Sequence, residues 1–469
     1  MRKFATVLLA LLLVASLVIG CAPSNPPVES QTPKESEKAP EVKPTDKPKD
    51  PEVTEEPVKP AGVSITVQVE ADWMEHYEAA AKRVKDANPD ATIELKEVAC
   101  FTHIETLEQT DATNEDVADV FAIPADRLVS LANKDLIGAV DAQAMAAKLG
   151  GWDDFDGGLG GLFKLNDEYR AFPFNIETLV AFANVKNAKA LGLEVPEDLS
   201  QVEPLELNYL PDPAYCLIPV FDTWFGVALM NSADIALLKQ DGDTFVSDMT
   251  TPWDELDADK KAAIEVLYKY WKLNADNNTT LFDAEAGWGY IDSHFESGSD
   301  GIIRIGGPWD IGNMKALTSD GEDLVILPIG IITAAGKPLK HWQGGWGLTI
   351  NPRIEEDPAK VALAEAMICE IVNPEYAVDL FKAAGKILEN VPYDVYAASD
   401  LDEVEKSLIK AVLESYADSP GRPLFEQYGN VWDTYKNAIL SWNAVKPADA
   451  AAAYAEIKAS FDNMMANLK

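Results

Sequence analysis

Alternating patterns of apolar and polar residues mark out strands and helices in the N-terminal half of the chain. Apolar residues at every second position predict a strand over residues 64–69, and apolar residues at helical spacing predict a helix over 74–87. Two further strands are predicted over 91–98 and 119–123, and a helix over 125–133. This order predicts an α/β fold with a parallel sheet covered by helices, in which ligands bind at the carboxyl ends of the strands.

Longer helical patterns fill the C-terminal half and are separated by short apolar runs. The predicted helices cover residues 257–273, 358–371, 374–384, 401–416 and 448–468. The apolar runs cover residues 301–305, 324–332 and 347–350. The stretch from residue 63 to the C-terminus is longer than a usual domain of about 100 to 200 residues. We therefore expect two lobes.

The first 21 residues have the pattern of a bacterial lipoprotein signal. Arg2 and Lys3 precede an apolar run over residues 4–15, and small residues then lead to Cys21. The run is shorter than the ~20 apolar residues of a membrane-spanning helix. We predict removal of residues 1–20 and acylation of Cys21, which would anchor the mature chain on a membrane face. A plain signal-anchor helix is the alternative.

Residues 21–62 have a composition that cannot bury a hydrophobic core. After the cysteine, the segment consists almost entirely of Pro, Glu, Lys, Thr, Ser and Val, and it contains no aromatic residue. Such a composition predicts a disordered but semi-rigid stalk that extends by ~3 Å per residue. A long stalk suits a cell wall without an outer membrane. We therefore expect the protein on the extracellular face of the cell membrane.

The chain is strongly acidic and poor in cysteine. It contains 39 Lys and Arg against 78 Asp and Glu, for a net charge of −39. This charge disfavours nucleic acid and anionic membrane surfaces as partners, and we attribute it to solubility on a crowded cell surface. Cys100, Cys216 and Cys369 show no metal-ligand spacing. We interpret them as small buried apolar side chains, with one disulfide among the three as the alternative.

Several short motifs occur together in an order that resembles a known family. After the strand-helix-strand unit that begins at Ser64, they are Ala118-Asp119-Val120-Phe121 before Asp126-Arg127, Tyr169-Arg170-Ala171-Phe172-Pro173-Phe174, Gly306-Gly307-Pro308-Trp309, Gly344-Gly345-Trp346-Gly347-Leu348-Thr349-Ile350 and Val431-Trp432. In this order the globular part resembles family 1 extracellular solute-binding proteins of ABC transporters. The pattern is most similar to the maltose and maltodextrin binders within that family.

The resemblance implies two α/β lobes of the periplasmic-binding-protein type, joined by hinge crossovers, with a sugar held between them. The first lobe would comprise residues 63–175 and 329–388, and the second lobe residues 176–328 and 389–469. The crossovers would fall near residues 174–176, 326–328 and 388–390. Ligand contacts that exist only in the closed state would drive the lobes together.

The resemblance also implies the partners of the protein. The ligand would be a malto-oligosaccharide, delivered to the permease subunits of an ABC importer. We expect a monomer that meets the membrane only through its lipid anchor, and we expect neither a cofactor nor a metal.

Polar candidates for the sugar site are Asp126, Arg127 and Glu177. The first two follow a predicted strand and offer an acceptor beside a fork of donors, which together can bridge vicinal hydroxyls. Such a pair is more often a helix cap and a surface charge, but the resemblance favours sugar binding. Glu177 matches the family's carboxylate that accepts from sugar hydroxyls, and an acid near a helix N-terminus is its alternative role.

Aromatic candidates are Trp309, Trp432, Trp346 and Tyr215. The resemblance assigns Trp309 and Trp432 to stacking on sugar faces, while Trp346 could line the cleft or pack in the sheet. Tyr215 is displaced by one position from the family's tyrosine. Ile123 stands where close maltose binders have a tryptophan, so one stacking wall is weakened and the sugar's identity stays open.

A secreted glycoside hydrolase with two carboxylates in a similar cleft is the alternative from another class. A binder of a different oligosaccharide is a second alternative. The chain has no Gly-x-Ser-x-Gly or His-Glu-x-x-His motif and only four histidines. Asp276-Asn277-Asn278 begins like a calcium loop, but Leu281 replaces the required glycine. We therefore predict a binding protein and not an enzyme.

Overall fold

The computed structural model describes residues 62–193 and 203–468. The predicted signal over residues 1–20, the acylated Cys21 and the stalk up to residue 61 lie outside the described residues. Among the helices that are described, none is long and apolar enough to cross a membrane.

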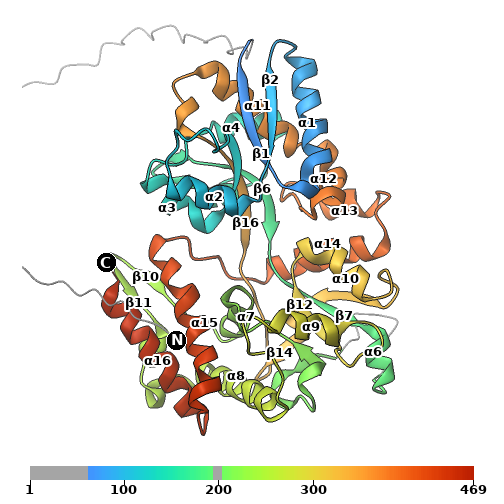
Figure 1. Cartoon of the computed structure of the whole chain (residues 1–469), viewed down its shortest axis with the longest axis vertical. Coiled ribbons are helices and arrows are strands. Elements are labelled where there is room, and N and C mark those ends of the chain that lie inside the picture. The colour runs from blue at the N-terminus through green and yellow to red at the C-terminus, as the bar shows by residue number, and fades with distance from the viewer. Residues whose placement is uncertain (1–61, 194–202, 469) are drawn as a thin grey trace, which may run out of the picture. The chain divides into compact units, whose positions relative to one another are not determined.

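A five-stranded sheet forms the first lobe, with the strand order β2-β1-β3-β16-β6 (Figure 1). Its strands are β1 (Ser64–Val69), β2 (Thr92–Glu97), β3 (Val120–Pro124), β6 (Phe172–Glu177) and β16 (Gly344–Ile350). β1 is parallel to β2 and β3, as predicted, whereas β16 is antiparallel to both β3 and β6. The carboxyl ends of β3 and β6 therefore meet the start of β16 at one edge of the sheet.

Helices cover the faces of this first sheet. They are α1 (Met74–Ala87), α2 (Cys100–Gln109), α3 (Leu128–Asn133), α4 (Ala142–Lys148), α5 (Leu159–Leu162), α11 (Pro358–Ile371) and α12 (Ala377–Ala384). α1 packs against α11 and α12, which come from a distant part of the sequence. Arg83 joins α1 to α11, because its Nε donates to the Glu370 carboxylate at 2.7 Å. A small hairpin, β4 (Lys164–Leu165) with β5 (Glu168–Tyr169), completes the lobe.

The second lobe contains a four-stranded sheet with the order β13-β7-β12-β9. Its strands are β7 (Val180–Asn184), β9 (Cys216–Leu217), β12 (Ile303–Gly306) and β13 (Leu324–Pro328). The helices of this part of the chain are α6 (Val185–Ala190), α7 (Thr223–Ser232), α8 (Ala258–Asp276), α9 (Gly287–Phe295), α10 (Ile311–Leu317), α13 (Tyr393–Ala397), α14 (Glu403–Ala417), α15 (Gly429–Val445) and α16 (Ala450–Asn467). α15 and α16 lie side by side, and α16 also packs on α8 (Figure 1). These two sheets with their helices confirm the predicted two-lobed α/β fold.

Two small sheets accompany the second lobe. β8 (Leu205–Glu206), β14 (Ile332–Ala334) and β15 (Lys337–Pro338) form one of them, and β10 (Lys239–Asp241) with β11 (Thr244–Val246) forms the other. β14 pairs with β8 and packs on α7 and α8. Residues 329–342, which we expected in the first lobe, therefore stay with the second lobe. The chain returns to the first sheet only at Gly344.

Two further crossovers join the two sheets. β6 ends at Glu177 in the first sheet and β7 begins at Val180 in the second. The later crossover follows α12, where Ile387 pairs with Ile176 of β6. Near it, the Glu389 carboxylate accepts from the backbone N–H of Leu159 in the first lobe. The hinge segments thus lie against one another.

All three described cysteines are buried and unpaired. They are Cys100 at the start of α2, Cys216 on β9 and Cys369 in α11. This confirms the interpretation as small apolar side chains, and the alternative of a disulfide among them is wrong.

Candidate functional site

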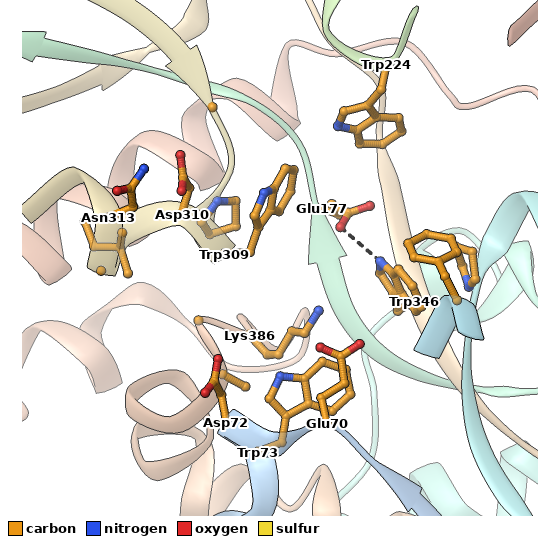
Figure 2. Close-up of a pocket in the computed structure, with 18 of the residues that line it drawn as sticks. Glu70, Asp72, Trp73, Glu177, Trp224, Trp309, Asp310, Asn313, Trp346 and Lys386 are labelled. Atoms are coloured by element: carbon orange, nitrogen blue, oxygen red, sulfur yellow. Dashed lines mark hydrogen bonds between the residues drawn. The ribbon is translucent and has the colours of Figure 1, made fainter. Parts of the chain in front are cut away.

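A cavity of about 1280 Å³ lies between elements of the two lobes. Small-molecule pockets usually have volumes of about 300–1,000 Å³. This cavity is larger, so it has room for an oligosaccharide. Figure 2 shows Trp309, Asp310 and Asn313 on one side of it, and Glu70, Asp72 and Trp73 on another. Six of the seven predicted ligand-binding residues line this cavity: Asp126, Arg127, Glu177, Trp309, Trp346 and Trp432.

Asp126 follows the carboxyl end of β3, in the short helix η2 (Ala125–Arg127). Its Oδ1 lies 2.9 Å from Nη2 of Arg422, and the two side chains are only 15% and 6% exposed. Arg422 comes from the segment between α14 and α15, far away in the sequence. The predicted sugar acceptor is therefore held in a buried ion pair. Arg422 is therefore a site residue that the sequence analysis did not identify.

Arg127 lies beside Asp126 but in a different environment. Its side chain is 44% exposed, and its Nη1 lies 3.9 Å from a carboxylate oxygen of Glu108. A pair this long and this exposed is weak. The guanidinium donors of Arg127 are therefore available to a ligand in the cavity.

Glu177 is the last residue of β6 and is 8% exposed. Its Oε1 accepts a hydrogen bond from Nε1 of Trp346 at 2.9 Å, drawn as a dashed line in Figure 2. Burial raises the pKa of Glu177, while the nearby cations Lys386 and Arg422 and the hydrogen bond from Trp346 oppose that rise. The register of β16 against β6 shifts between Trp346 and Gly347. This β-bulge lies beside the Trp346–Glu177 contact, in keeping with the use of bulges to aim side chains near sites.

Trp309 extends into the cavity from η8 (Pro308–Asp310), which follows β12. Its side chain is 43% exposed, which is unusual for a tryptophan. A Cβ at Gly307 would lie 2.1 Å from the indole, so the ring can lie over the backbone there only because this residue is glycine. An exposed ring on a preformed turn is suited to stacking on the C–H face of a sugar.

Trp432 lies near the start of α15, and its backbone carbonyl accepts from Thr223 Oγ1 at 2.6 Å. Its ring is part of an aromatic cluster with Trp224 and Trp342. The Arg422 guanidinium carbon lies 4.6 Å from the centre of the Trp224 ring and 5.8 Å from that of Trp432. The ion pair with Asp126 thus links the first lobe to aromatic residues of the second.

Tyr215 lies outside the cavity. It is in η5 (Pro213–Tyr215), directly before β9, and it packs partly buried against the hydrophobic core. Asp212 caps this short helix by accepting from Ala214 N–H. The run Asp212-Pro213-Ala214-Tyr215 therefore acts as a structural turn here, and the structure does not bring Tyr215 to the other candidates.

Aromatic residues that sequence reasoning missed line the cavity as well. They include Trp73, Phe101, Trp224 and Trp288. Trp73 follows the carboxyl end of β1, and ligands bind at the carboxyl ends of parallel strands. Ile123, which we regarded as a weakened stacking wall, is fully buried in β3 and does not line the cavity. Rings from other elements, such as Trp73 and Phe101, supply aromatic surface on the first lobe.

The cavity lining contains more carboxylates than cationic groups. Some of them neutralise each other: Arg304, buried in β12, places Nη1 2.5 Å from Asp292 and Nη2 3.5 Å from Asp310. Burial raises the pKa of Asp310, and the Arg304 charge opposes that rise. Within residues 62–193 and 203–468, no group of His, Cys, Asp and Glu side chains is arranged to hold a metal ion. Aromatic rings and hydrogen-bonding side chains line the cavity.

Comparison with known proteins reveals structural likeness at low sequence identity. The maltose-binding protein MalE of Listeria monocytogenes, solved with maltose, superposes with a TM-score of 0.65 at 18% identity, covering 87% of this chain and 99% of that one. MalX of Streptococcus pneumoniae, solved with maltopentaose, gives 0.63 at 19% identity, covering 85% and 99%. The GacH receptor of Streptomyces glaucescens, solved unliganded and with acarbose, gives 0.62 at 16% identity, covering 87% and 100%.

No protein-family model matches the sequence, and no curated protein does. The structural likeness nevertheless extends over nearly the full length of each of these three proteins. The chain therefore has the two-lobed fold of maltose- and maltodextrin-binding proteins.

Proposed function

We propose that this protein, which has the fold of maltose-binding proteins, is a receptor for maltose or maltodextrin-like oligosaccharides. The observation that carries the proposal is the composition of the cleft. Exposed Trp309 faces it from the second lobe, while Arg127 and the buried carboxylate of Glu177 face it from the first lobe. Rings that stack on C–H faces, combined with donors and acceptors for hydroxyls, match the chemistry of a sugar.

The test is to incubate the purified protein with maltotetraose and then to separate the sugars. A binder returns the tetrasaccharide unchanged and unfolds at a higher temperature in its presence, because ligand at about 100 times Kd stabilises the folded state by ~2.7 kcal/mol. Shortened products would identify a hydrolase instead. Unchanged sugar together with an unchanged melting temperature across maltose, maltotriose and maltotetraose would refute the proposal.

Sugar binding is proposed to close the cleft. Arg127 lies on the first lobe and Trp309 on the second, so a ligand that contacts both favours the state in which the lobes lie close together. Small-angle scattering of the protein with and without saturating maltotetraose measures this. A decrease in the radius of gyration is expected, and an unchanged radius at saturation would contradict closure.

Delivery to an ABC importer from the membrane surface is the second part of the proposal, motivated by the lipoprotein signal that ends at Cys21. Cys21→Ser should prevent acylation and release the protein from membranes, while sugar affinity of the folded part stays the same. A variant that remains acylated and membrane-bound would refute the anchor. Reconstitution with candidate permease subunits would then test delivery, with sugar uptake that depends on this protein as the expected result.

A further inference from the structure

Lys386 presents its ammonium group to the floor of the cleft. The residue is only 8% exposed, yet it lines the cavity, and Figure 2 shows its side chain pointing between Glu177 and Trp73. Its Nζ lies 4.9 Å from the ring centre of Trp73, 5.2 Å from that of Trp346 and 5.7 Å from that of Phe174. The charge is therefore surrounded by aromatic faces.

These rings do not satisfy the ammonium. In the part of the chain that the structure describes, Lys386 makes no hydrogen bond and has no carboxylate oxygen within 4.0 Å of Nζ. Aromatic faces attract a cation, but they do not supply the lone pairs that three N–H donors require. The ammonium faces the cleft, so its donors are available to oxygen atoms of water or of a ligand there.

The backbone around Lys386 fixes where this ammonium lies. Gly385 ends α12 in the left-handed conformation, with φ of 63°, and its N–H donates to the Phe381 carbonyl. A Cβ on Gly385 would lie 2.9 Å from the Pro308 carbonyl oxygen across the cleft. On the other side, Ile387 pairs with Ile176 of β6. Lys386 is thus held between two anchored residues at a hinge crossover.

Two carboxylates on the same floor each keep one oxygen for a ligand. Oε1 of Glu70 accepts from Cys100 N–H at 2.9 Å, and Oε1 of Glu177 accepts from Trp346 Nε1 at 2.9 Å. Within the described residues no hydrogen bond to the Oε2 of either is found. The floor therefore combines a cationic donor with anionic acceptors. Vicinal hydroxyls, which donate and accept at the same time, complement this combination.

We infer that Lys386 is a ligand-binding residue that donates to hydroxyl oxygens of an uncharged sugar and thereby contributes to its selection. The inference rests on the proposed function. A charged ligand group would fit less well at this point, because an anion would meet Glu70 and Glu177 and a cation would meet Lys386.

The test compares Lys386→Met with Lys261→Met in the full chain. Methionine keeps an unbranched stem of similar reach but removes the charge and the donors. Lys261 is the matched control, because its Nζ lies 5.2 Å from the Trp253 ring centre but it does not line the cavity. Calorimetric titration with maltotetraose should show binding weakened by about 10- to 100-fold in Lys386→Met and changed by less than about twofold in Lys261→Met.

A second measurement uses the wild-type protein, so that it does not depend on how well the variant folds. Lysine acetylation by an amine-reactive ester is followed by mass spectrometry with and without saturating maltotetraose. The sugar should slow acetylation of Lys386 relative to Lys261. Lys386→Met binding within about twofold of wild type, or acetylation of Lys386 that saturating sugar does not slow, would overturn the inference. Absence of maltotetraose binding by the wild type would instead refute the proposed function.

Discussion

The Asp126–Arg422 ion pair provides a quantitative test of how the site is held together. Both side chains are nearly buried, so removing one partner leaves the other charge uncompensated. Breaking such a pair costs about 3–5 kcal/mol of unfolding free energy, whereas replacing both partners costs much less. Asp126→Ala and Arg422→Met should therefore each destabilise the protein by at least about 3 kcal/mol, and the double variant by less than their sum.

The size of the thermal shift follows from the length of the described chain. With ~2.1 cal/mol/K of unfolding entropy per residue over roughly 400 residues, 3–5 kcal/mol lowers the melting temperature by ~4–6 °C in a single cooperative transition. Arg127→Ala is the control, because its side chain is 44% exposed and its contact with Glu108 is 3.9 Å long. That variant should lose under about 1 kcal/mol.

Guanidinium chloride unfolding of the wild type, both single variants and the double variant completes a double-mutant cycle. We expect a coupling of about 3 kcal/mol or more between the two positions. If the double variant loses the sum of the two single-variant losses to within about 0.5 kcal/mol, the conclusion that this pair links Asp126 to the aromatic cluster is refuted.

Three further predictions concern the other candidates. Trp309→Ala should weaken maltotetraose binding by about 10- to 100-fold while the melting temperature stays nearly constant, because the ring is 43% exposed and its removal leaves no core cavity. Calorimetry measures the affinity and thermal unfolding of the same sample measures the stability. Lost stability with unchanged affinity would place the ring in the core. Burial raises the pKa of Glu177 above the ordinary value of 4.5, so the unfolded chain loses its proton first and the folded protein loses stability as the pH rises above 4.5. Glu177→Gln should remove this loss, so the unfolding free energy of the variant relative to wild type should increase between pH 4.5 and 7, as denaturant unfolding at each pH measures. The variant should also bind sugar more weakly. A difference in unfolding free energy that shrinks over this range would contradict burial as the dominant cause of the raised pKa. Tyr215→Phe should leave the Kd for maltotetraose within about twofold of wild type, and a tenfold loss would return Tyr215 to the site.

Local pattern was sufficient to predict many of the elements. The helix predicted over residues 358–371 is α11, and the strand predicted over 64–69 is β1, each with the same bounds in the structure. Asp357 caps α11 by accepting from Ala359 and Lys360 N–H, so its start is encoded in adjacent residues. Such signals lie within a few residues of the element that they define, and they can be read from one sequence.

The partners within the site could not be predicted in this way. Arg422 reaches the cleft from the segment between α14 and α15, and Lys386 reaches it from a hinge crossover; no periodic pattern marks either segment. Their neighbours Asp126 and Trp73 lie hundreds of residues away in the sequence. Tyr215 had a suggestive motif around it, yet the motif forms a capped turn at the edge of the core. Whether a side chain lines the cleft depends on tertiary packing, which local spacing does not encode.

Calorimetric titration of the wild-type protein with a series of malto-oligosaccharides tests the central claim most directly. For a transport receptor we expect saturable binding at one site with a micromolar Kd, which corresponds to a binding free energy of about −8 kcal/mol, and recovery of the sugar at its original length. Absence of binding heat and of thermal stabilisation for every member of the series, or recovery of shortened sugars, would contradict the claim that this cleft is a malto-oligosaccharide receptor site.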